Sequence, residues 1–284
     1  MSLRKRGRGT RAKSARGEEW DELLDEAARA RRRVRPSEQI DALRHLFDDP
    51  GLAGVDPAAA AVVINVTSAR CRVFLDGRDL DCIVPPEIAA RQKSALAVGD
   101  RVLLDDDLRL AAILPRRSVL SRPDPLNPHL QRLIAANIDV VANVVSMKSP
   151  PLRPRLIDRF LIAIQRGGAA PLIVVNKIDL DRDLTSLIVY EELGVPVIAC
   201  STKTGQGLDE LRAAVNGKTS ALVGHSGVGK SSILNALDER LRIATGDLHR
   251  RGTGRHTTTS STLHDLGGGT LIVDTPGIRE LGLW

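Results

Sequence analysis

Hydrophobic and polar residues alternate over short distances between positions 60 and 118. The runs "AVVINVTSARCRVFLDG", "RDLDCIVP" and "VGDRVLLDDDLRLAAILPR" contain no long helical repeat, and turn signals such as Asp-Gly separate the apolar stretches. Short alternating runs between turn signals are typical of β-strands joined by hairpins. Residues 59–120 therefore predict a small all-β barrel, for which the OB-fold is the natural candidate.

The pattern changes after the Pro-rich boundary "SRPDPLNP" at 121–128. Apolar strand-like runs occur at 139–147, 170–176, 196–200, 219–224 and 270–274. Helical segments separate them at 151–166, 182–193, 208–215 and 229–238. Strands that alternate with helices predict a mainly parallel sheet covered by helices on its faces. Residues 121–284 are thus expected to form an α/β domain.

The first 58 residues follow neither pattern. Residues 1–16 hold seven Lys and Arg and no acid, whereas the rest of the chain holds 34 basic and 35 acidic residues. The segment "EEWDELLDEAARARRRVR" (18–35) predicts a helix, and 36–58 a linker. Because each cation beside a phosphate releases counterions, the basic arm is either a nucleic-acid contact or a solvated tail.

Composition narrows the class of protein. The three cysteines have no paired spacing, which indicates reduced thiols rather than a disulfide framework. No apolar run reaches the ~18 residues of a membrane span, and no apolar stretch follows the charged start as it would in a signal peptide. We expect a cytoplasmic protein without a membrane partner.

The segment "GHSGVGKS" (224–231) matches the phosphate-loop pattern G-x-x-x-x-G-K-[ST] between a strand-like run and a helical one. Its glycines let backbone N–H groups close around a phosphate at a helix N-terminus. Lys230 would neutralise phosphate oxygens, and Ser231 would bind Mg²⁺. The expected nucleotide contacts here are Gly224, His225, Ser226, Gly227, Val228, Gly229, Lys230, Ser231 and Ser232.

The segment "NKID" (176–179) follows the strand-like run "PLIVV". The carboxylate of Asp179 can accept both the N1–H and the exocyclic amine of guanine, a donor pair that adenine lacks. A second base-contact loop is expected in "CSTKTGQGL", after the run "PVIAC". The sequence therefore predicts GTP and GDP as ligands, with base contacts from Asn176, Lys177, Asp179, Ser201, Thr202 and Lys203.

Two segments have the form of GTPase switches. In "DTPG" (274–277), Asp274 would reach Mg²⁺ through water, and Gly277 would donate its N–H to the γ-phosphate. The polar segment "GTGRHTTTSST" (252–262) corresponds to a first switch, whose threonine would complete the Mg²⁺ shell when GTP is bound. Thr257, Thr258 and Thr259 all qualify, and we favour Thr258. A polar loop without a ligand is the alternative.

The motifs occur in an unusual order, because the guanine-binding segment "NKID" precedes the phosphate loop "GHSGVGKS". An ordinary GTPase acquires this order if its chain is cut between the second switch and the strand before the guanine-binding segment. Its original N- and C-termini would then be joined near residues 216–218. The motifs still gather at the carboxyl ends of the predicted strands, where an open α/β sheet binds its ligand. We interpret the domain as a circularly permuted P-loop GTPase.

A barrel-like segment followed by "GHSGVGKSS", "RHTTT" and "DTPGIRELGLW" closely resembles the RsgA (YjeQ) family of small-ribosomal-subunit biogenesis GTPases, over about residues 60–284. The resemblance implies an OB-fold, a permuted GTPase domain and a C-terminal zinc-binding domain. It also implies a monomer that binds the 30S subunit and its 16S rRNA late in maturation, with GTP hydrolysis stimulated there.

This sequence departs from the family pattern at two points. The basic arm and helix at 1–35 are longer than the resemblance requires. The sequence also stops at Trp284 without the Cys/His cluster of the zinc domain, so the zinc expected from the resemblance has no ligand cluster in this chain; either the chain is truncated or this member lacks the domain. Ile278 stands where many GTPases place a glutamine that orients water. The resemblance points to His256 as the catalytic substitute, and the alternative is an exposed loop histidine without a catalytic role.

Two other functions fit the same motifs. One is a GTP-gated rRNA-binding module with negligible turnover, and the other is a permuted GTPase of large-subunit assembly, against which the preceding barrel argues. The barrel has only Phe74 for base stacking, so any RNA contact would rest on charge and shape. Candidate residues are Arg70, Arg72, Arg78 and Arg101. A purely structural barrel is the alternative.

Overall fold

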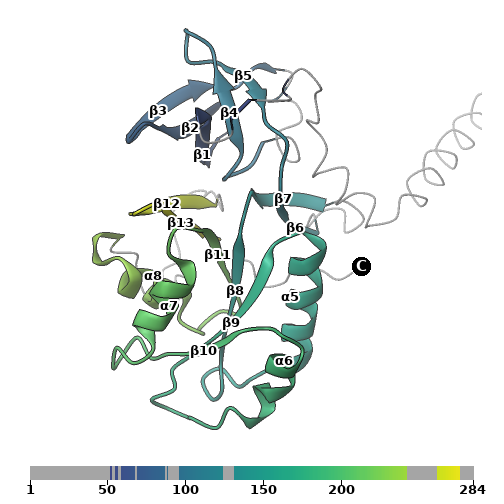
Figure 1. Cartoon of the computed structure of the whole chain (residues 1–284), viewed down its shortest axis with the longest axis vertical. Helices are drawn as coiled ribbons and strands as arrows, with labels where there is room; N and C mark the ends of the chain where they lie inside the picture. The colour runs from purple at the N-terminus through teal and green to yellow at the C-terminus, as the bar shows by residue number, and fades with distance from the viewer. Residues whose placement is uncertain are drawn as a thin grey trace, which may run out of the picture.

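Three β-sheets organise the described part of the protein (Figure 1). The computed structural model describes residues 59–67, 69–86, 96–123, 131–241 and 261–275, together with residues 52, 55, 56 and 88. The described part contains a five-stranded sheet, a six-stranded sheet and a two-stranded ladder. The predicted basic arm and the predicted helix at 18–35 lie outside the described residues.

The N-terminal sheet is antiparallel, with the order β3-β2-β1-β4-β5. Its strands are β1 (Ala61–Val66), β2 (Arg70–Leu75), β3 (Arg78–Ile83), β4 (Arg101–Leu104) and β5 (Leu110–Ile113), so each strand lies inside a predicted run. Asp76 and Gly77 take positive φ angles of 48° and 77° and close the β2–β3 hairpin at the predicted turn. A parallel bridge between Ile83 and Arg109 brings the two edges of the sheet together.

The ladder of β6 (Val119–Pro123) and β7 (Gln131–Ala136) links the two larger sheets in sequence. A buried polar joint holds it to the N-terminal sheet. Arg116 donates to both carboxylate oxygens of Asp100, at 2.7 and 2.8 Å, with both side chains almost fully buried. Asn137 donates to the carbonyl of Gly99 at 3.0 Å, and a Cβ on Gly99 would lie 2.1 Å from the Ala136 oxygen. The junction is therefore a close-packed contact.

The six-stranded sheet has the order β10-β9-β8-β11-β13-β12, and only the β12–β13 pair is antiparallel. Its strands are β8 (Val140–Ser146), β9 (Ala170–Asn176), β10 (Val197–Ala199), β11 (Thr219–Val223), β12 (Thr262–Gly267) and β13 (Thr270–Asp274). The mainly parallel sheet is confirmed. The sequence interpretation did not include β12, whose residues "TLHDLG" have little strand character apart from their pairing with β13.

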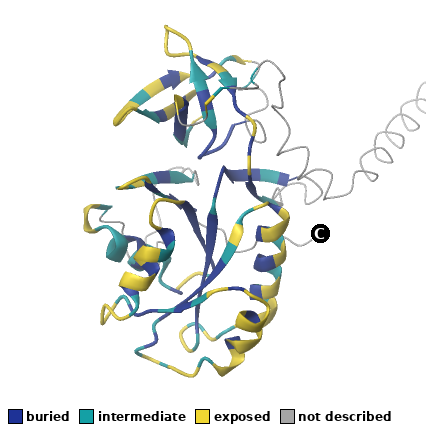
Figure 2. Cartoon of the chain, in the orientation of Figure 1, coloured by how far each residue is buried: buried dark blue, intermediate teal, exposed yellow. Residues whose placement is uncertain are grey.

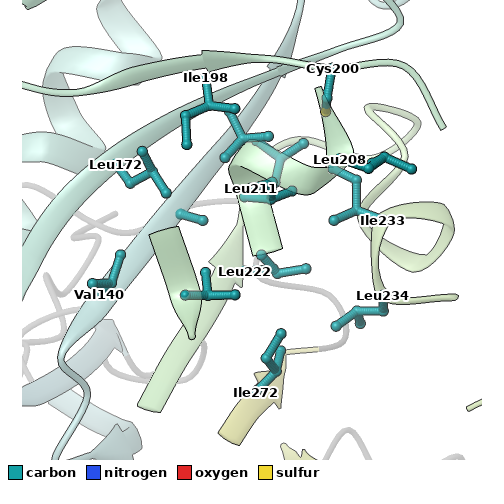
Figure 3. Packing of buried hydrophobic residues seen from close by; sticks show 14 of the residues in the cluster. Val140, Leu172, Ile198, Cys200, Leu208, Leu211, Leu222, Ile233, Leu234 and Ile272 are labelled. Carbon is teal, nitrogen blue, oxygen red and sulfur yellow. The ribbon is translucent and has the colours of Figure 1, made fainter. Parts of the chain in front are cut away.

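Helices cover both faces of this sheet. They are α5 (Pro154–Arg166), α6 (Ile188–Glu192), α7 (Leu208–Val215) and α8 (Lys230–Leu237), with short 3-10 turns at Thr185–Leu187 and Glu239–Leu241. Val141 of β8 belongs to a core cluster with Phe160 and Ile164 of α5. Val144 belongs to a second cluster with residues of α7 and α8, part of which Figure 3 shows. Burial on both faces explains why the central strands are apolar throughout (Figure 2).

In the described ranges, no helix has both the length and the apolar character that crossing a membrane requires.

Candidate nucleotide-binding site

The phosphate-loop segment connects β11, at the centre of the sheet, to α8. Gly224, Gly227 and Gly229 have positive φ angles of 138°, 82° and 97°. A Cβ on Gly224 would lie 2.2 Å from the Val144 oxygen, and one on Gly229 would lie 2.3 Å from Asn176 Nδ2. Only glycine fits at these two positions, because the backbone conformation and the neighbouring atoms both exclude a side chain.

Lys230, the first residue of α8, points back into this loop. Its Nζ donates to the carbonyls of Gly224 and His225, at 2.7 and 3.1 Å. Burial lowers the pKa of Lys230, and the nearby carboxylate of Asp274 opposes that shift. A cation enclosed by the loop is suited to bind phosphate oxygens, whose negative charge would replace the carbonyl partners.

Asn176, at the end of β9, connects three loops. It is fully buried. Its Nδ2 donates to the carbonyl of Val228 in the phosphate loop at 2.9 Å. Its Oδ1 accepts the N–H groups of Lys177 and Thr202, at 2.8 and 3.3 Å. The phosphate loop and both predicted base loops therefore share one anchoring side chain.

Lys177 adds a second connection to the phosphate loop. It has a positive φ angle of 67°. Its Nζ donates to the carbonyls of Gly227 and Ser149, at 2.6 and 2.5 Å. The loop after β8, which contains Ser149, was not singled out in the sequence, because only the folded chain brings it beside residue 177.

Asp179 lies with the second base loop. Its Oδ1 accepts a hydrogen bond from Ser201 Oγ at 2.7 Å, and its Oδ2 lies 4.0 Å from Lys203 Nζ. Ser201 is fully buried, and its Oγ accepts the backbone N–H of Lys203 and of Thr204 at 3.3 Å. This arrangement holds a carboxylate acceptor pair against the second base loop, as guanine recognition requires.

Oxygen donors suited to Mg²⁺ lie at the same edge of the sheet. Ser231 follows Lys230 in α8, and Asp274 ends β13, the neighbour of β11. Burial raises the pKa of Asp274, whereas the nearby charges of His264 and Lys230 oppose that shift. Hydroxyl and carboxylate oxygens fit a small hard cation that keeps most of its waters. In the described ranges, no group of three His, Cys, Asp or Glu side chains could hold a metal ion.

The structure gathers most of the predicted site residues at the carboxyl ends of β9, β10, β11 and β13. Two contributors were missed. Buried Thr275 donates to the carbonyl of Leu222 at 2.7 Å, and His264 of β12 interacts electrostatically with Asp274. No sequence signal marks His264, because the β12–β13 register alone places it there. The positions outside the described residues are His256, Thr257, Thr258, Thr259 and Gly277.

Comparison with known proteins agrees with this geometry. The model of the RsgA GTPase family matches residues 113–284. A protein of Gemmatimonas aurantiaca named small ribosomal subunit biogenesis GTPase RsgA is 42% identical over 199 residues, which cover 66% of this chain and 65% of that relative. A relative of the same name from Chlorobaculum parvum is 38% identical over 243 residues, covering 79% and 78% of the two chains. The chain belongs to the RsgA GTPase family.

Solved structures support the same fold. YjeQ from Thermotoga maritima superposes with a TM-score of 0.61 at 30% identity, covering 79% of this chain and 77% of the other. YloQ, described as a circularly permuted GTPase, has a TM-score of 0.54 at 25% identity, covering 78% and 72%. In the present chain the base-reading strand β9 precedes the phosphate-loop strand β11, so this RsgA family member has the permuted motif order. Membership in a GTPase family also implies the use of GTP and GDP with Mg²⁺.

Proposed function

We propose that this protein hydrolyses GTP as an assembly factor of the small ribosomal subunit, late in 30S maturation and stimulated by the subunit. The observation that carries the proposal is the bond from Asn176 to Val228, which joins a guanine-type base loop to a phosphate loop. The relatives' shared name, small ribosomal subunit biogenesis GTPase, supports the small ribosomal subunit as the particle on which the protein acts. We place the protein in the cytoplasm as a monomer.

We further propose that residues 59–120 form an OB-fold that contacts 16S rRNA, as the resemblance implies. The sheet order β3-β2-β1-β4-β5 and the parallel bridge from Ile83 to Arg109 support a closed five-stranded barrel. Arg70 and Arg72 are exposed on β2, where they could face phosphates. Arg101 on β4 is half-buried and therefore less accessible to a phosphate than Arg70 and Arg72.

In the proposed GTP complex, residues 224–232 and the N–H of Gly277 hold the phosphates, while Asp179 and Ser201–Lys203 hold guanine. Ser231, Thr258 and, through water, Asp274 would bind Mg²⁺, which supplies charge neutralisation at the phosphates. His256 would orient the attacking water, because the side chain of Ile278 has no polar atom that could do so.

Two substitutions test separate parts of this proposal. Asp179→Asn should move affinity from GTP toward XTP, because an amide opposes guanine N1–H but can donate to the extra carbonyl of xanthine. His256→Ala should keep GTP affinity and GTP-dependent 30S binding while losing the 30S-stimulated rate by roughly 10²-fold. Nucleotide titration and single-turnover hydrolysis, with and without 30S subunits, measure these effects.

Each alternative predicts a distinct result. Unchanged GTP affinity in Asp179→Asn would remove this carboxylate from the base site. Full 30S-stimulated hydrolysis by His256→Ala would exclude the histidine as the water-orienting group. GTP-dependent 30S binding without turnover in the wild type would indicate the nucleotide-gated RNA module, and selective sedimentation with 50S particles would indicate a large-subunit factor.

A further inference from the structure

A cleft of about 570 Å³ lies between the N-terminal sheet and β12. One wall comes from β1, β2 and β3, and the other comes from Thr262, Leu263 and His264 of β12. Strands β1 and β12 are in contact there, and Figure 1 shows β12 beside the N-terminal sheet. The volume falls within the ~300–1,000 Å³ of pockets that hold ligands of small-molecule size. The cleft is therefore large enough to hold a ligand.

The wall formed by β12 is fixed from behind. Leu263 is buried in a core cluster that also contains Val62 of β1 and Val273 of β13. Thr262 stands directly opposite Asp274 in the β12–β13 ladder. The GTPase domain therefore contributes one side of the cleft, and this side adjoins the end of β13 that the predicted Mg²⁺ site uses.

The opposite wall carries cations and carboxylates side by side. Arg70 and Arg72 lie on the exposed face of β2, with a buried residue between them. Asp81 stands directly opposite Arg72 in the β2–β3 ladder and accepts a hydrogen bond from its Nε at 3.0 Å. Asp79, two residues before Asp81, lies on the same face of β3 and is also exposed. All four side chains line the cleft.

Several polar groups in this lining have no partner inside the protein. In the ranges that the structure describes, no hydrogen bond or ion pair engages the side chains of Asn65, Arg70, Asp79 and Thr262. They comprise an amide, a guanidinium group, a carboxylate and a hydroxyl. Hydrogen-bond donors and acceptors are thus both available to a ligand.

This mixture fits an unpaired nucleotide better than a phosphate group alone. Carboxylates repel a phosphate, so a site for an RNA backbone or a lipid headgroup would gain nothing from Asp79 and Asp81. An unpaired base presents amino donors that a carboxylate can accept, while its phosphate suits a guanidinium group. In a duplex those donors are occupied by base pairing, and base-specific recognition of RNA mostly targets single strands.

We propose that this cleft binds one unpaired nucleotide of a single-stranded RNA, with a base that carries an exocyclic amino group. The carboxylate of Asp79 accepts the amino group, Thr262 supplies a hydrogen bond from the β12 wall, and Arg70 binds the adjoining phosphate. The inference rests on the proposed ribosomal function. It adds base recognition, which specifies a sequence where phosphate contacts only position the protein, at a site that β12 shares with the N-terminal sheet.

The test uses the full chain and single-stranded RNA of about ten nucleotides, within the ~4–16 nucleotides that an OB-fold covers. Oligocytidine and oligouridine are compared, because cytosine has an amino donor where uracil has a carbonyl acceptor. A fully paired RNA duplex is the third probe. Affinity is measured by fluorescence anisotropy at several salt concentrations.

Single substitutions separate the contributions of the two walls. Asp79→Ala and Thr262→Val remove the contacts to the base, and Arg70→Gln removes the contact to the phosphate. Asp106→Ala is the matched control for the carboxylate, because Asp106 is exposed in the β4–β5 hairpin and does not line the cleft. Arg78→Gln is the control for the guanidinium group, because Arg78 is exposed on β3 outside the lining. Thermal melting confirms that each variant folds.

The wild type should bind oligocytidine more tightly than oligouridine or the duplex. Asp79→Ala should weaken oligocytidine binding roughly tenfold or more and abolish the preference over oligouridine, because a hydrogen bond to a charged group is lost. Thr262→Val should weaken it by roughly threefold to tenfold. Arg70→Gln should weaken both oligonucleotides alike and reduce the log–log salt slope by about 0.7, the value for one phosphate contact on a single strand. Both controls should keep the wild-type values.

Tighter RNA binding by Asp79→Ala would overturn the proposal, because a surface that contacts phosphates alone predicts that result. Equal affinity of the wild type for all three probes would overturn it as well, and so would equal losses in Arg78→Gln and Arg70→Gln. Normal oligocytidine binding by Thr262→Val would exclude the shared site. Absence of RNA binding by the wild type would leave the cleft to a protein partner.

Failure of the proposed function gives a different result. In that case the wild type neither sediments with 30S subunits nor is stimulated by them. The oligonucleotide series still judges the cleft, because it requires neither the subunit nor GTP hydrolysis.

Discussion

Asn176→Ala should destabilise the free protein and weaken GTP binding at the same time. The substitution removes the bond to the Val228 carbonyl and leaves the N–H groups of Lys177 and Thr202 without their acceptor. Three backbone groups from three loops lose their partner, and Lys177 also loses the bond that supports its left-handed conformation.

The size of the effect follows from these three bonds. At about 1 kcal/mol for each lost bond, the free energy of unfolding should fall by about 3 kcal/mol. In a domain of this size that corresponds to a melting temperature about 6–12 °C lower. GTP affinity should fall roughly tenfold or more, because the base loops and the phosphate loop no longer hold a common geometry.

The assay is thermal unfolding of the free protein combined with calorimetric titration of GDP and GTP. Asn143→Ala is the matched control, because it removes the same atoms from a buried asparagine of the neighbouring strand β8, and Asn143 Nδ2 has no hydrogen-bond partner in the described part of the protein. The control should shift the melting temperature much less and leave nucleotide affinity near the wild-type value.

Two results would refute the reasoning. If free Asn176→Ala melts within about 2 °C of the wild type, its three bonds do not support the folded state. If both asparagine variants lose stability equally, burial of an amide matters and its hydrogen bonds do not.

Two further predictions concern backbone fit and the buried ion pair. Gly229→Ala should weaken nucleotide binding by roughly 2 kcal/mol or more in fluorescence titration, since its Cβ would lie 2.3 Å from Asn176 Nδ2 at a φ angle of 97°; wild-type affinity would show that the loop adapts. Arg116→Met should cost about 3–5 kcal/mol in denaturant unfolding, because it leaves Asp100 buried without its cation, and adding Asp100→Leu should recover part of the loss. Equal stability of the single and double variants would contradict this.

Local sequence patterns determined most of the strands, the helices of the α/β domain and the motif segments of this protein. "GHSGVGKS" predicts a turn between a strand and a helix because glycine spacing and helix-forming residues act over a few positions. The same holds for the Asp76–Gly77 hairpin, where a left-handed turn needs these residue types. The reversed order of "NKID" and "GHSGVGKS" indicated a circularly permuted domain, since motif order is a property of the sequence alone.

Only the tertiary structure decided which of these segments meet. The bond from Asn176 to Val228 joins residues far apart in the chain, and it exists because the sheet places β9 one strand away from β11, with β8 between them. Strand β12 forms only against β13, so its own residues could not reveal it. The opposition of Thr262 and Asp274 likewise depends on strand register. Residue spacing along the chain does not predict such contacts. Strands far apart in sequence pair in the register that buries their apolar faces, and local propensity does not specify that register.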